Sequence, residues 1–160
     1  KYGFNIEFQR YNVSDPLPEK LVGKFDVFSS EPLETLSGLK TFVLRGILSL
    51  KKNGVGYFGL TTLEASPKKW LEIEKMVTET GCRITDIIRD FSIYPTTYDS
   101  ISYEKFITKF NFPVEKNPGV DWYKSSLFRI EALDELPSEM NKRIEIETVD
   151  LEDDVTHPNL

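Results

Sequence analysis

Three glutamates follow predicted strands of this chain, at the points where a sheet could meet a ligand. Glu31 and Glu34 come shortly after the β-rich run 25–28, and Glu64 comes shortly after the run 55–60. Ligands of open α/β sheets bind beyond the carboxyl ends of the strands, so we expect the three carboxylates on one rim. A rim with several carboxylates suits a cationic ligand. For each glutamate alone, the alternative is a place near a helix start, where it favours the helix dipole by ~0.3–1 kcal/mol.

Aromatic side chains gather in the stretch 94–125, between the last two predicted strands. Tyr94, Tyr98, Trp122 and Tyr123 are suited to wall a pocket or to make cation–π contacts with an amine. The alternative for each of them is plain packing of this stretch onto the sheet. Among them we select Tyr94 and Trp122 as candidate substrate-binding residues.

The chain has a single cysteine, Cys82, and a single histidine, His157. Intrachain disulfides and zinc sites built from clustered thiolates are therefore excluded. Every nucleophile activated by a histidine would need His157, which lies in the tail. We therefore expect a site that uses neither a metal nor such a nucleophile, in a reducing, cytoplasmic setting.

The net charge of −6 is unevenly spread. Residues 131–160 hold ten acidic and two basic side chains, whereas residues 1–130 hold sixteen acidic and eighteen basic ones. The near-neutral body has no basic stripe, so nucleic-acid binding is not expected. No apolar stretch approaches the ~20 residues of a membrane span, so a membrane partner is not expected either. The default interpretation of the acidic tail is a solvated, partly disordered end.

The first part of the chain predicts two strands and a helix. Residues 5–11 alternate apolar and polar side chains and predict a strand. The run 25–28 is short and rich in β-formers, which predicts a buried strand. A helix ending at Asn53-Gly54 is predicted next, because apolar residues recur at steps of three and four. These residues are Leu36, Leu39, Val43, Ile47 and Leu50.

Residues 55–60 predict a further strand that contains two glycines, Gly56 and Gly59. Glycine weakens a strand and often marks the close approach of another backbone or of a ligand. We therefore expect something to pack closely on this strand.

A second helix and two strands complete the predicted elements. Ser66 followed by Pro67 predicts the helix start, and Gly81 predicts its end. Its buried face is predicted to hold Trp70, Ile73 and Val77. Residues 83–93 and 126–130 predict strands, and the stretch between them is consistent with a hairpin that carries a long insertion.

The order strand, helix, strand, helix, strand is typical of a mostly parallel sheet with helices on its faces. We predict an α/β fold, the C-terminal half of a Rossmann-like, doubly wound sheet. Residues 1–133 form this domain with the insertion 94–125, and residues 134–160 form the acidic tail. The glycine-rich turn that binds nucleotides in such folds is absent from the sequence, and a start at Lys1 suggests a longer parent. We therefore expect the chain by itself to be inactive.

Five segments in order resemble the archaeal branched-chain polyamine synthases, the bis(aminopropyl)spermidine synthase family. The resemblance runs from roughly Ile6 to Glu131. Its segments are FDVFSSEPLETL, FVLRGILSLK, GYFGLT with the following LEASPKKWLEI, ITDIIRDF and WYKSSLFRIE. The family's usual Asp-Pro-Pro-Glu-Thr is here Glu31-Pro32-Leu33-Glu34-Thr35, so the first carboxylate lies one methylene farther out. The fold that the resemblance implies is a methyltransferase-like Rossmann domain behind a winged-helix domain.

The resemblance implies transfer of aminopropyl groups from decarboxylated S-adenosylmethionine to the secondary amine of spermidine, twice, giving a quaternary ammonium. We expect no metal to take part, and we expect a homo-oligomer. Both substrates are cationic, so rim carboxylates suit them. An unperturbed alkylamine has a pKa near that of lysine, about 10.4, so the attacking amine must lose its proton to a base.

On this interpretation each candidate residue has a role. Glu31 and Glu34 are catalytic, beside the reacting nitrogen. The polyamine is bound by Glu64, which holds a distal ammonium, and by Tyr94 and Trp122. The co-substrate is bound by Asn12 and Val13, which face the adenine, and by Ser30 and Pro32.

Two alternatives remain open. One is an S-adenosylmethionine-dependent N-methyltransferase, because the loop after residue 28 resembles the (Asp/Asn)-Pro-Pro-aromatic loop of that group. Against it, no aromatic stands at Leu33 or Glu34. The other is a non-enzymatic regulatory or nucleic-acid-binding protein, which the implied winged-helix domain suggests.

Overall fold

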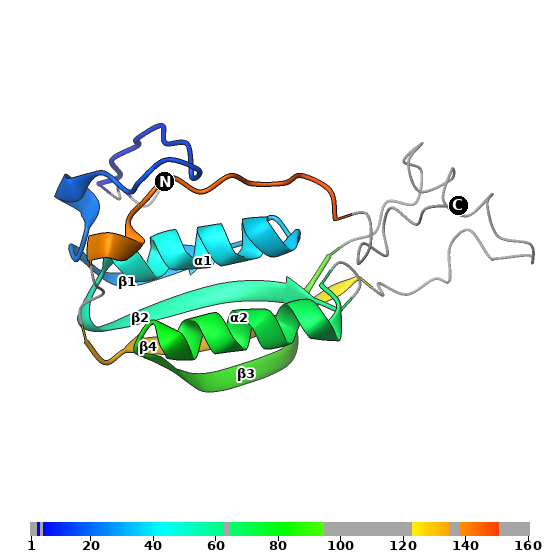
Figure 1. The fold of residues 1–160 in the computed structure, drawn as a ribbon. Coiled ribbons are helices and arrows are strands. Elements are labelled where there is room, and N and C mark those ends of the chain that lie inside the picture. The colour runs from blue at the N-terminus through cyan, green and yellow to red at the C-terminus, as the bar shows by residue number, and fades with distance from the viewer. Residues whose placement is uncertain (1–2, 4, 63–64, 95–122, 135–137, 151–160) are drawn as a thin grey trace, which may run out of the picture.

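The computed structural model describes residues 3, 5–62, 65–94, 123–134 and 138–150, and Figure 1 shows its course. The described residues form two helices and four strands, with one 3₁₀ turn before the first strand and one after the last. In chain order they are η1 (Glu19–Leu21), β1 (Phe25–Ser30), α1 (Leu36–Ser49), β2 (Leu50–Thr61), α2 (Pro67–Glu79), β3 (Cys82–Ile93), β4 (Lys124–Ala132) and η2 (Ser138–Met140). No helix among the described residues is long and apolar enough to cross a lipid bilayer.

The four strands form one sheet in the order β1-β2-β4-β3. β1 pairs with β2 in parallel, and β4 lies antiparallel between β2 and β3. The predicted α/β, Rossmann-like class is confirmed, as is the hairpin of the last two strands. Three strands run in one direction, so β1, β2 and β3 end on the same rim of the sheet.

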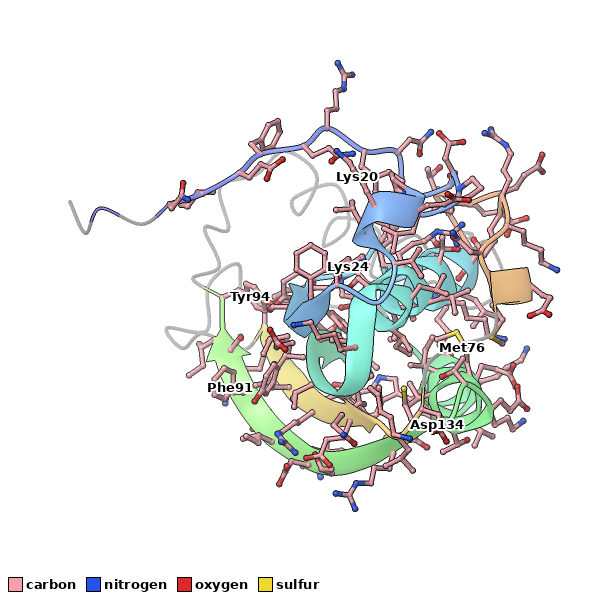
Figure 2. The ribbon with its side chains drawn as sticks, turned by 90° about the vertical axis from the view of Figure 1, so that its left-hand side faces the viewer. Lys20, Lys24, Met76, Phe91, Tyr94 and Asp134 are labelled. Atoms are coloured by element: carbon pink, nitrogen blue, oxygen red, sulfur yellow. The ribbon has the colours of Figure 1, made fainter. Side chains whose placement is uncertain are left out.

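Both helices lie on one face of the curved sheet, which Figure 2 shows along the strands. The apolar faces predicted for the two helices are largely confirmed, because Leu39, Val43, Ile47, Ile73 and Val77 are fully buried. From the sheet side the core is completed by Phe58, Leu60, Phe128 and Ile130. The rings of Phe58 and Phe128 stack with centroids 5.0 Å apart. The opposite face, here called the open face, is covered by no helix of the described residues.

The predicted signals at the ends of α2 are confirmed. Ser66 is the N-cap and accepts a hydrogen bond from the Lys69 amide, and Pro67 is the first helical residue. Gly81 follows the helix with φ +75°, a conformation that glycine adopts without strain. Local chemistry therefore sets the bounds of this helix.

The predicted end of α1 at Asn53-Gly54 is wrong. The helix ends at Ser49, and β2 begins at once with Leu50. The pairing between β1 and β2 jumps from Leu50 to Val55, and Asn53 has φ 64° within that jump. The turn-forming pair therefore marks an irregularity inside the strand, not a helix end.

The predicted strand 5–11 is also wrong, because this segment is irregular. Ile6 and Phe8 are 80% and 89% exposed, and the segment pairs with no strand of the described residues. A strand does form at β1 as predicted, but its predicted burial is wrong. β1 is the edge strand, and Phe25 and Val27 are 44% and 55% exposed.

Part of the acidic tail packs on the protein. Residues 138–150, here called the strap, run along the outer side of α1 toward the helix start (Figure 1). Ile144 and Met140 join a small apolar cluster around Leu17, Leu44 and Leu48. The described part of the tail is therefore a packed segment, in contrast to the solvated end that its charge suggests.

Candidate active site

The centre of the candidate site is Glu31, the first residue after β1. Its carboxylate accepts a hydrogen bond from the Tyr94 hydroxyl, with 3.1 Å between the oxygens. That hydroxyl also lies 3.3 Å from the hydroxyl of Ser125, near the start of β4. Three elements therefore meet here, since Tyr94 directly follows β3 (Figure 2).

The carboxylate of Glu31 lies directly against β2. A Cβ atom built on Gly59 would come 2.7 Å from its Oε2 atom, which is closer than real Cβ contacts allow. In the same strand, a Cβ on Gly56 would come 2.3 Å from the ring of Phe28. The close approach predicted at both glycines is confirmed, although side chains rather than a backbone make it. Only glycine at position 59 leaves Glu31 in this place.

Glu34 has a different environment from Glu31. Its carboxylate accepts two hydrogen bonds from Thr61, one from the amide at 3.1 Å and one from the hydroxyl at 2.9 Å. Its main-chain oxygen accepts a hydrogen bond from the ammonium of Lys69 at 3.0 Å. These bonds join the loop after β1 to the end of β2 and to α2. The carboxylate of Glu34 is therefore engaged in hydrogen bonds within the protein, whereas Glu31 is exposed.

The Tyr94 side chain contacts Tyr123 in addition to Glu31. Its ring meets that of Tyr123 edge to face, with centroids 5.1 Å apart. Partial burial raises the pKa of its hydroxyl above the usual 10, and the nearby carboxylates of Glu31 and Glu34 raise it further. The phenol therefore stays protonated at neutral pH and can donate its hydrogen to Glu31.

The other candidate residues lie in different parts of the structure, and only some of them are near Glu31. Ser30 ends β1, and Pro32 is buried in the loop beside Glu31. Asn12 and Val13 lie elsewhere, because the Val13 carbonyl accepts a hydrogen bond from Arg45 in the third turn of α1. That turn is roughly 13 Å along the helix axis from its start beside Glu34. Glu64 and Trp122 lie outside the described residues.

Sequence reasoning missed Thr61, Ser125 and above all Lys69, which is 1% exposed. A signal for Lys69 was available. Lys68 and Lys69 occupy the first turn of α2, where the positive end of the helix dipole disfavours cations. Lysines in that place indicate a partner of opposite charge. In the part of the chain that the structure describes, no group of acidic, histidine or cysteine side chains could hold a metal ion.

A family model, the branched-chain polyamine synthase A C-terminal domain, matches residues 1–157. The N(4)-bis(aminopropyl)spermidine synthases of Thermococcus kodakarensis and Methanocaldococcus jannaschii are 40% and 42% identical to the chain. Each alignment covers 81% of this chain and 37% of the relative. A crystal structure of the Thermus thermophilus branched-chain polyamine synthase, with N4-aminopropylspermidine and 5'-methylthioadenosine, superposes with a TM-score of 0.71. It is 34% identical, and the match covers 88% of this chain and 40% of that one. The chain thus spans about two fifths of the length of these relatives.

Proposed function

We propose, from the premise that this chain belongs to the branched-chain polyamine synthase family, that it carries the amine-binding side of an aminopropyltransferase active site. The polyamine acceptor is spermidine, and the donor is decarboxylated S-adenosylmethionine. The observation that carries the proposal is the exposed Glu31 carboxylate, oriented by Tyr94 and seated against Gly59 on the strand rim. A carboxylate in this position attracts ammonium groups and accepts protons from them.

The transfer requires a nucleophilic nitrogen. In the proposed step the amine nitrogen attacks the aminopropyl carbon attached to sulfur, so that a C–N bond forms and the C–S bond breaks. The bonding electrons pass to sulfur, and 5'-methylthioadenosine leaves as a neutral thioether. Before the attack, the protonated amine gives a proton to the Glu31 carboxylate, which frees the nitrogen lone pair and holds the nitrogen in line. The tertiary ammonium that results loses its remaining proton in the same way, and the tertiary amine then attacks a second donor to give the quaternary ammonium.

The two loop glutamates have separate roles in this proposal. Glu31 is the catalytic residue, since its carboxylate is the exposed one. Glu34 holds the loop against β2 through Thr61. Glu64, Trp122, Asn12, Val13, Ser30 and Pro32 stay predictions for binding the two substrates. The homo-oligomer and the cytoplasmic location also stay predictions.

The test uses the longest natural protein that contains this sequence, with spermidine and decarboxylated S-adenosylmethionine. Mass spectrometry reads the product, which gains about 57 mass units per aminopropyl group. Because removing a general base typically loses 10²–10⁴-fold, Glu31→Gln should lower kcat by roughly that factor. Glu79→Gln, an exposed change at the end of α2, is the matched control.

Two results would contradict the proposal. An unchanged kcat in Glu31→Gln would remove Glu31 from the chemical step. A product that gains about 14 mass units with S-adenosylmethionine, and none with the decarboxylated donor, would instead establish the N-methyltransferase alternative.

A further inference from the structure

The strap is tied to α1 at both of its ends. At its start the Arg45 guanidinium, only 4% exposed, donates a hydrogen bond to the Lys142 carbonyl at 2.6 Å. Toward its end the Glu147 carbonyl accepts from the Thr35 hydroxyl at 2.7 Å, and the Glu147 amide donates to the Ser37 hydroxyl at 2.9 Å. The strap therefore reaches the first turn of α1, which follows the Glu31–Glu34 loop.

Asp150 carries the contact that matters most there. One of its carboxylate oxygens, Oδ2, accepts a hydrogen bond from the Leu36 amide at 2.6 Å. The same oxygen lies 2.9 Å from the ammonium of Lys69. The side chains of Lys69 and Asp150 are only 2% and 13% exposed, so this ion pair is largely removed from water. It also occupies the positive end of the α1 dipole, which favours an anion.

Lys69 also contacts the loop that carries Glu31 and Glu34. Its ammonium donates to the main-chain oxygen of Glu34, whose carboxylate is in turn held by Thr61. Asp150, Lys69 and Glu34 thus form a continuous polar chain from the strap to the loop that ends three residues after Glu31. Removing the Asp150 carboxylate would take one charged partner from a buried lysine, so the Lys69 side chain would shift from its present place.

We infer that Asp150 and Lys69 are positioning residues, through which the strap fixes the place of the Glu31 carboxylate. The inference rests on the proposed function. It makes the strap a part of the catalytic apparatus even though none of its described residues contacts Glu31 directly. A carboxylate displaced by about 1 Å can lower a rate about 10²-fold, so a small shift of the loop is sufficient.

The experiment again uses the longest natural protein, with kcat and KM measured for spermidine. Asp150→Asn should lower kcat about 10–100-fold. KM should change by less than about threefold, because the charged groups that attract the polyamine remain. Asp150→Glu, which restores the charge, should recover most of the rate. Glu145→Gln, an exposed change of equal charge in the same strap, should match the wild type.

A double variant separates positioning from folding. Lys69→Met with Asp150→Leu replaces the buried ion pair by apolar side chains, an exchange that often preserves stability. If the pair positions the loop, the double variant keeps the melting temperature of the wild type but stays slow in kcat. If the pair only stabilises the fold, the rate recovers together with the melting temperature, and the inference is overturned.

The activity of the wild-type protein separates the test of the positioning role from the test of the proposed function. Wild-type turnover together with full activity in Asp150→Asn would overturn the positioning role and leave the proposed function intact. A wild-type protein that forms no aminopropylated product would instead refute the proposed function. The double variant decides the case in which Asp150→Asn fails to fold.

Discussion

At the scale of single residues, the two glutamates of the loop after β1 serve different partners. Both are carboxylates on one rim, as their spacing after a strand predicts. Thr61 satisfies Glu34 with two hydrogen bonds, whereas Glu31 accepts one from Tyr94 and remains exposed. This difference depends on which strand residue faces each carboxylate. It could not be predicted from the loop sequence alone.

Gly59 and Gly56 offer a matched pair of substitutions. In Gly59→Ala the new Cβ would clash with the end of the flexible Glu31 side chain, which can swing aside. We expect kcat to fall about 10²-fold with little change in melting temperature. In Gly56→Ala the Cβ would meet the Phe28 ring and lie 2.9 Å from Ile130 in the core. Overpacking of this kind costs about 1–3 kcal/mol, so here the melting temperature should fall.

Steady-state kinetics and thermal unfolding of both variants check this contrast. Equal losses of activity and stability in the two proteins would contradict it. Such a result would mean that both substitutions act through the packing of β2.

At the scale of elements, local signals predicted the helices better than the strands. The ends of α2 follow from Ser66, Pro67 and Gly81, because caps and left-handed residues act within one turn. Strands depend on partners that lie far away in the sequence. The alternation in 5–11 meets no partner among the described residues, which is why a strand-like pattern remains irregular there.

The N-cap of α1 does more than cap the helix. Thr35 accepts a hydrogen bond from the Gly38 amide and donates one to Glu147 of the strap. Thr35→Ala should therefore lower the free energy of unfolding by about 1–3 kcal/mol, the sum of a lost cap and a lost hydrogen bond. Ser66→Ala, which removes only the cap of α2, should lower it by about 1 kcal/mol.

Urea unfolding of the two variants and of Thr35→Ser provides the measurement. The serine variant keeps the hydroxyl and should lie close to the wild type. A Thr35→Ala loss no larger than that of Ser66→Ala would show that the bond to the strap adds no stability.

At the scale of the whole molecule, the sequence predicted the four strands of the sheet, their common rim and the hairpin, but not the strap. The acidic composition of the tail indicates a solvated end. Hydropathy gives no sign that the side chain of Asp150 is only 13% exposed. The contact becomes visible only once α1 and α2 pack side by side and bring Lys69 beside Leu36. Composition describes a segment in isolation, whereas the strap is ordered by contacts with two buried charged residues, Arg45 of α1 and Lys69 of α2.

Arg45 links three distant parts of the chain. From α1 it donates hydrogen bonds to the Val13 carbonyl near the N-terminus and to the Lys142 carbonyl in the strap. A lysine at this position keeps the charge but loses the planar fork that reaches both carbonyls. Hydrogen bonds to a charged group contribute about 1.5–3 kcal/mol each, so Arg45→Lys should lower the free energy of unfolding by about 2 kcal/mol.

The location of faster hydrogen exchange shows whether Arg45 links two particular segments or stabilises the whole fold. In Arg45→Lys, hydrogen exchange should accelerate at residues 11–15 and 138–150, which the guanidinium joins, while β2 and β4 keep their protection. Arg83→Lys is the matched control, because the Arg83 side chain is 61% exposed and its ion pair with Glu131 contributes about 0–1 kcal/mol. Uniformly faster exchange across the sheet would show that Arg45 supports the core as a whole. Selective opening of residues 11–15 and 138–150 would show that one buried cation holds both segments against α1, including the strap on which the Glu31 loop depends.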